Sequence, residues 1–125
     1  MVNMFKIHTI GGYNEVGKNM TAVELEDDVF IFDAGLYLHA VIDLQESTRL
    51  STSKLLADVG ALPDDSLLDK LRDKVRAIIV THAHLDHVGS VQHIANKYPN
   101  AAICGTPFTM EVLKALMADS KNFIK

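Results

Sequence analysis

Hydrophobic and polar positions alternate through the first third of the chain. Residues 4–10 (MFKIHTI) place Phe5 and Ile7 on one face, as in a β-strand with one buried side. Residues 20–26 (MTAVELE) alternate again, and residues 29–35 (VFIFDAG) form an almost continuous apolar run. Such a run is typical of a strand that is buried on both faces. Three consecutive strands with short connections predict an antiparallel meander.

Two short helices are predicted in the middle of the chain. The first lies in STSKLLADVGALP, where Ser51 or Ser53 is the expected N-cap. In the second, SLLDKLRDK, Ser66 and Asp69 have the spacing of a capping box. We expect one face of this second helix to carry an apolar stripe of Leu67, Leu68 and Leu71.

Strands and helices alternate in the remaining sequence. Residues 75–80 (VRAIIV) predict a buried strand, and the next helix has apolar positions at Val88, Val91, Ala95 and Tyr98. Residues 101–104 (AAIC) predict a short strand, in which Cys104 is expected to be a small buried hydrophobic residue.

The last helix is expected to begin with Thr106 as its N-cap and Pro107 at its first position. Its apolar stripe is predicted to be Phe108, Val112, Ala115 and Leu116. This order of elements predicts an α/β or α+β fold, with helices packed on a mixed sheet.

Composition limits the functional classes without choosing one. The chain has 125 residues, enough for one domain, with 48% hydrophobic and 22% charged residues. Its net charge of −4 argues against a general nucleic-acid-binding surface, but it allows a site whose positive charge comes from a metal. The single cysteine excludes an intrachain disulfide. Without an apolar leader or membrane span, a cytoplasmic location is expected.

Three of the six histidines lie in the segment THAHLDHVGS, directly after a predicted strand. His82 and His84 leave the same side of an extended backbone, and Asp86 and His87 follow where the chain turns into a helix. Imidazole and carboxylate are ligands that zinc prefers. Four ligands within six residues cannot wrap one tetrahedral ion, but they can serve two ions about 3.5–4 Å apart. We therefore assign His82 and His84 to one ion, and Asp86 and His87 to the other.

The other histidines carry less information. His8 is expected to be exposed on a strand, and His93 to point away from the cluster. His39 could lie in the core, on the surface or against a substrate. The glycine-containing loop GGYNEVGKN lacks the spacing of a phosphate-binding motif, so it predicts a plain hairpin connection.

The segment THAHLDHVGS resembles the signature of the metallo-β-lactamase fold. This resemblance implies a four-layered αββα sandwich, with the metals at the edge of its two sheets and held by the four residues assigned above. The stretches GGYNEVGKNM, FDAG and YPNAAICGTPFTMEVLK are similar to ribonuclease J and its archaeal relatives, which are β-CASP nucleases. Asp33 matches the family's first motif acid, which braces the metal-binding loop; the alternative is an acid that caps nearby amides.

The resemblance implies a metal-dependent ribonuclease that acts on single-stranded RNA. Cleavage would run from 5′ to 3′, with endonucleolytic cuts in addition, and would use two Zn²⁺ ions, although Mn²⁺ also accepts such ligands. Asp33 and Asp86 are the expected catalytic acids, Asp86 by orienting the attacking water. A homo-oligomer (dimer) is expected.

Residues 1–125 are expected to be only the N-terminal part of the metallo-β-lactamase domain. The inserted β-CASP domain and the other half of the sandwich, with further metal ligands, would come from sequence beyond position 125. Two alternatives remain open: a thioesterase or lactonase of the same fold, and a non-catalytic fragment that pairs with another chain.

Overall fold

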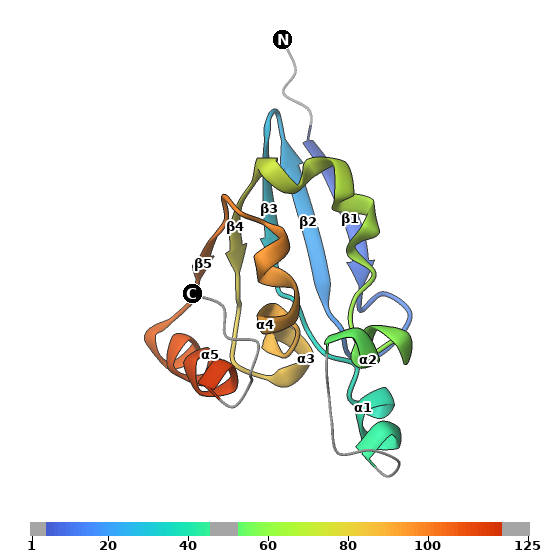
Figure 1. The fold of residues 1–125 in the computed structure, drawn as a ribbon. Coiled ribbons are helices and arrows are strands. Elements are labelled where there is room, and N and C mark those ends of the chain that lie inside the picture. Colours follow the sequence, from blue (N-terminus) through green and yellow to red (C-terminus); the bar gives the residue numbers. More distant parts are fainter. Residues whose placement is uncertain (1–4, 46–52, 119–125) are drawn as a thin grey trace.

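The fold contains one mixed sheet of five strands in the order β1-β2-β3-β4-β5 (Figure 1). The computed structural model describes residues 5–45 and 53–118. Strands β1 (Phe5–Gly11), β2 (Met20–Leu25) and β3 (Asp28–Phe32) pair antiparallel, which confirms the predicted meander, although position 4 of the first strand lies outside the described residues. Strands β4 (Val75–Ile79) and β5 (Ala102–Cys104) add in parallel. The predicted mixed α and β class is confirmed.

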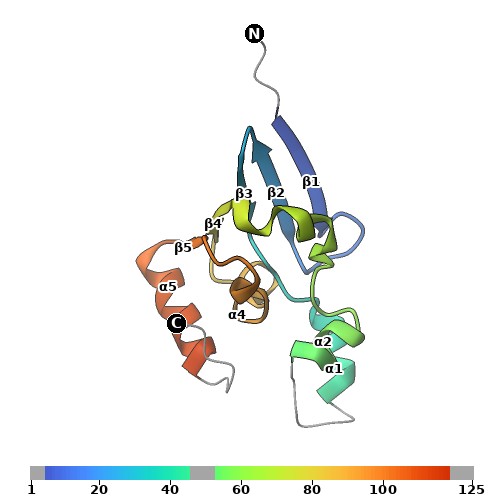
Figure 2. The same cartoon turned by 45° about the horizontal axis from the view of Figure 1, so that its top comes forward.

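Seven helical segments connect and follow these strands in the described ranges. They are α1 (Leu38–Gln45), α2 (Ser53–Asp58), η1 (Asp65–Lys74), α3 (Leu85–Val88), α4 (Val91–Ile94), η2 (Ala95–Lys97) and α5 (Pro107–Ala118). Figures 1 and 2 show η1 and α4 in front of the same face of the sheet. Over the ranges that the structure describes, no helix is long and apolar enough to cross a membrane.

The main core lies between this face of the sheet and the helices. Strand register places Ala22 opposite Ile31, and Ile31 beside Ile78, so these side chains share one face. All three are fully buried. The helices cover them with the buried residues Leu68, Val88, Val91, Ile94, Leu113 and Met117. Burial of this apolar surface is the main favourable contribution to folding.

The opposite face of the sheet, which we call the open face, is apolar but largely uncovered by the described residues. Its members, as the strand register places them, are Phe5, Ile7, Val23, Leu25, Phe30, Phe32 and Ile79. Phe5 and Ile7 are 60% and 57% exposed, and Phe32 is 37% exposed. The prediction that the third strand is buried on both faces is therefore wrong for Phe32, because among the described residues only the helix-covered face has a packing partner.

The second predicted helix forms, but with a different cap and phase. It is the 3₁₀ helix η1, and Asp64, not Ser66, is its N-cap, since its carboxylate accepts the Ser66 amide at 3.1 Å. A 3₁₀ helix repeats every three residues, which aligns Leu68 with Leu71 and leaves Leu67 62% exposed. Of the two N-caps proposed for the preceding helix, position 51 lies outside the described residues, and Ser53 is the first residue of α2.

The helix predicted after β4 is interrupted. Its apolar positions are buried as expected, but α3 ends at Val88 and α4 begins at Val91. Gly89 lies at the junction, where an added Cβ would stand only 2.6 Å from the carbonyl oxygen of Leu85. Backbone packing at this position therefore accepts only glycine without movement.

At the C-terminal end, the predicted cap is confirmed, and the predicted stripe is wrong for Phe108 and Ala115, while Leu116 packs against the core. The hydroxyl of Thr106 accepts the amide of Thr109 at 3.2 Å, which caps α5. The buried face consists of Thr109, Leu113 and Met117, whereas Phe108 is 72% exposed. Cys104 is also exposed, contrary to expectation, because β5 is an edge strand.

Candidate metal centre

The histidine-rich segment forms the connection between β4 and α3. The amides of His87 and Val88 both donate to the carbonyl oxygen of His84 at 2.9 Å, which makes the first turn of α3. His84 itself is the N-cap, with an extended backbone. The chain thus changes from strand to helix within the cluster, so His82 and His84 come from the loop, and Asp86 and His87 from the helix.

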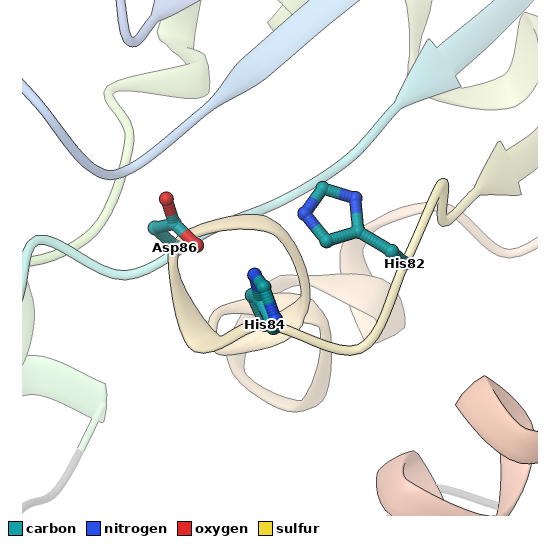
Figure 3. A group of neighbouring side chains, drawn as sticks. All are labelled: His82, His84 and Asp86. Atoms are coloured by element: carbon teal, nitrogen blue, oxygen red, sulfur yellow. The ribbon is translucent and has the colours of Figure 1, made fainter.

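The predicted ligands lie together in space. The candidate ligand atoms of His82, His84 and Asp86 are all within 4.8 Å of one another, and Figure 3 shows these side chains around the start of α3. The ring centroids of His82 and His87 are 4.0 Å apart, and Nε2 of His87 lies 3.7 Å from a carboxylate oxygen of Asp86. The four side chains form one cluster, while their division between two ions stays a prediction.

The donor set fits a divalent transition metal. Imidazole nitrogens and a carboxylate are the ligands that zinc binds in catalytic sites, and manganese accepts them as well. The side chains of Asp86 and His87 are only partly buried, which leaves the cluster open to solvent and substrate. The arrangement can therefore hold metal at a place that a substrate can reach.

Asp33 connects the end of β3 to this cluster. Its carboxylate accepts the Thr81 amide at 2.8 Å and the Nδ1 proton of His87 at 2.8 Å. The residue is 8% exposed and has a φ of +66°, a conformation that a short polar side chain tolerates. With the proton held on Nδ1, the lone pair of His87 Nε2 is free to bind a metal. Both expected roles of Asp33, a brace and an amide cap, agree with these contacts; a role in catalysis stays a prediction.

Backbone support for the cluster comes from residues that sequence reasoning did not select. Asn19 donates twice to the carbonyl oxygen of Asp86, from its backbone amide at 3.1 Å and from Nδ2 at 2.8 Å. Gly35 lies against the same peptide, since an added Cβ would stand 1.6 Å from that oxygen. The buried Ser90 hydroxyl donates to the carbonyl of Gly35 at 2.6 Å. The only indication in the sequence for Asn19 and Gly35 was that they lie in the stretches GGYNEVGKNM and FDAG.

The loop that precedes Asn19 is a hairpin connection between β1 and β2, as predicted. It also packs on the segment after β3, because the amide of Lys18 donates to the carbonyl of Leu36 at 3.1 Å. The loop therefore supports the site through its packing against this segment.

The other histidines lie outside the cluster. His8 is half-buried and pairs with Glu24 at 3.1 Å, so the expectation of an exposed residue is wrong. His93 bonds to the Ser53 hydroxyl at 2.7 Å, and its burial lowers the pKa of the imidazole. His39 is exposed on α1, with its ring 5.7 Å from that of Tyr37. Of the three alternatives left open for His39, the core is thereby excluded.

Comparison with known proteins agrees with this geometry. Residues 13–125 match the family model of the metallo-beta-lactamase superfamily. The chain is 44% identical to Ribonuclease J of Pyrococcus abyssi over 124 residues, which are 98% of this chain and 27% of that protein. It is 41% identical to Ribonuclease J of Methanocaldococcus jannaschii, over 94% of this chain and 26% of that protein.

A more distant relative is Ribonuclease J2 of Bacillus subtilis, with 32% identity over 87% of this chain and 17% of that protein. The chain thus spans about a quarter of the length of its archaeal relatives. The family match covers most of the chain, including the whole histidine cluster. The chain belongs to the metallo-beta-lactamase superfamily.

Proposed function

We propose that this chain is part of a zinc-dependent ribonuclease that cleaves single-stranded RNA from its 5′ end, with endonucleolytic cuts in addition. The observation that carries the proposal is the cluster of His82, His84, Asp86 and His87 at the end of β4. It is supported by 44% identity to a protein named Ribonuclease J. Cytoplasmic location and a homodimer are part of the same proposal.

The residues of the cluster would divide the work of binding. His82 and His84 would hold one ion, and Asp86 and His87 the second. When bound, zinc lowers the pKa of its water ligand to about 7 and offsets negative charge on the phosphate. Asp33 would keep the His87 ring oriented through the 2.8 Å bond to Nδ1. The carboxylate oxygen of Asp86 that does not bind the metal would orient the attacking water.

We further propose that residues 1–125 are the N-terminal part of the metallo-β-lactamase domain. The open face supports this, because a contiguous exposed apolar patch, here with Phe5 and Ile7, marks a surface that packs against another part of a protein. The second half of the sandwich would cover this face and supply the missing metal ligands. The inserted β-CASP domain would also follow in the downstream sequence.

The test uses the full-length protein and RNA that carries a 5′ monophosphate. The double variant His82→Ala/His84→Ala should lose RNA cleavage, since it removes both ligands of one ion. His8→Ala is the matched control, because that histidine lies outside the cluster, and it should leave cleavage intact. Cleavage retained by the double variant would contradict the proposal. Hydrolysis of thioesters or lactones without any RNA cleavage would instead support the alternative activity.

Elemental analysis after dialysis tests whether residues beyond position 125 complete the metal site. The full-length protein should contain close to two zinc ions per chain, whereas the isolated 125-residue chain should contain fewer. Two ions in the isolated chain would contradict the view that downstream residues complete the site.

A further inference from the structure

A pocket of about 550 Å³ opens beside the metal cluster, and the proposed chemistry does not account for it. It lies between α3, α1 and the loop that joins β1 to β2; Figure 1 shows α1 and α3 at the same end of the sheet. Two candidate metal ligands form one side of it, His84 and Asp86. The rest of the lining comes from Val16, Leu38 and His39, together with Ala83 and Leu85, which are neighbours of the two ligands in the sequence. A substrate bound at this cluster would therefore lie next to the pocket.

Part of the pocket lining exposes apolar surface. Val16 is 86% exposed, and Leu38 and Leu85 are 38% and 40% exposed. The phosphate of a substrate is charged and strongly hydrated, so it gains nothing from such a wall. A flat apolar group attached to that phosphate does gain, because burial removes apolar surface of both partners from water.

His39 adds an aromatic ring to this wall. The ring is exposed on α1 and meets the Tyr37 ring edge to face, with 5.7 Å between centroids. Tyr37 in turn lies under the ammonium group of Lys18, which is 5.7 Å from the Tyr37 centroid. The contact with Tyr37 limits the orientations of the histidine ring. Exposed histidine and other aromatic rings are surfaces on which unpaired RNA bases stack.

We propose that this pocket is a base subsite, in which the nucleobase next to the reacting phosphate stacks on His39. This inference rests on the proposed function and specifies how that site holds its RNA. Among the described residues, the side chains that line the pocket offer no amide or guanidinium group. Stacking without such donors recognises a base of any kind, so the subsite would favour unpaired RNA without selecting its sequence.

The first experiment compares two substrates in the full-length protein. One is an unmodified RNA, and the other lacks the base at the cleaved nucleotide. His39→Ala should raise KM for the unmodified RNA about tenfold, since stacking contributes roughly 1–3 kcal/mol per base. It should leave KM for the abasic RNA unchanged, and His39→Phe should restore the wild-type KM. Equal effects on both substrates, or no effect on either, would overturn the proposal.

A binding measurement separates this proposal from the proposed function. The fluorescence of 2-aminopurine riboside monophosphate should be quenched by the wild-type protein and by His39→Phe, but not by His39→Ala. Val16→Ser should weaken the quenching, whereas Val59→Ser, another exposed valine outside the pocket, should not. Failure of the wild-type protein to cleave RNA would refute the function alone. Absence of quenching by the wild-type protein would refute the subsite.

Discussion

Replacement of Gly35 by alanine tests whether the metal cluster depends on close backbone packing. Gly35 follows β3 and lies against the peptide that joins Asp86 to His87. An added Cβ would stand 1.6 Å from the carbonyl oxygen of Asp86 and 2.8 Å from the amide nitrogen of His87. Because real Cβ atoms do not approach below 3.0 Å, one of the two backbones must move. The residue has no left-handed φ, so the expected effect is steric alone.

The size of the effect follows from the hydrogen bonds between the two segments. Such movement weakens the bonds from Ala34 to His87 and from Leu36 to Leu85, both 2.9 Å long. It also weakens the 2.6 Å bond from Ser90 to Gly35. With about 1 kcal/mol for each bond and about 1–3 kcal/mol for overpacking, the free energy of unfolding should fall by roughly 4–6 kcal/mol. Zinc affinity should fall about 10–100-fold, as for other changes to the support of metal ligands.

Two measurements on the full-length protein check this prediction. Urea titration followed by circular dichroism gives the loss of unfolding free energy, and competition with a chromophoric chelator gives the zinc affinity. Gly105→Ala is the matched control, because its added Cβ would be 3.3 Å from the nearest atom, a side-chain methyl group of Thr109. We expect that control to stay within about 1 kcal/mol of the wild-type protein.

An unchanged zinc affinity in Gly35→Ala would refute the reasoning. It would mean that the backbone at Asp86 and His87 moves without weakening metal binding. If the variant does not fold, Asn19→Ala provides a second test. It removes the 2.8 Å bond from Nδ2 to the carbonyl of Asp86 without any clash. The expected loss is about 1 kcal/mol of stability, with a smaller decrease in zinc affinity.

Three further changes have distinct expected results. Asp33→Asn should lower zinc affinity about 10–100-fold in a chelator titration, since it removes the anionic acceptor of the His87 Nδ1 proton; equal affinity would exclude a bracing role. Burial lowers the folded-state pKa of His93, so its contribution to stability is complete above pH 6.5 and is lost as the pH falls from there through the folded-state pKa. His93→Gln should therefore reduce the loss of stability below pH 6.5 in urea titrations, and an unchanged pH dependence would contradict this. Leu68→Ala should cost about 2–5 kcal/mol in the same titrations, whereas Leu67→Ala should change stability by less than about 0.5 kcal/mol; similar losses would contradict the phase of η1.

The sequence determined the features that depend on neighbouring residues. Alternation and apolar runs predicted the strands in their correct order, and Thr106 with Pro107 predicted the start of α5. The clustering of the four candidate ligands could also be predicted, since they lie within six residues at a strand end. Each of these features is formed by residues that lie near one another in the sequence, so local geometry is sufficient to predict it.

Tertiary structure decided the features that join distant segments. Asn19 and Gly35 support Asp86 across more than 50 positions, which no periodicity encodes. The 3₁₀ geometry of η1 and the packing of α5 determine which side chains are buried, because each helix contains several apolar residues. Exposure of the open face and of His39 depends on which elements lie nearby, and a single sequence does not give that information. The chemistry is therefore local in the sequence, while the support that holds it in place is built from long-range contacts.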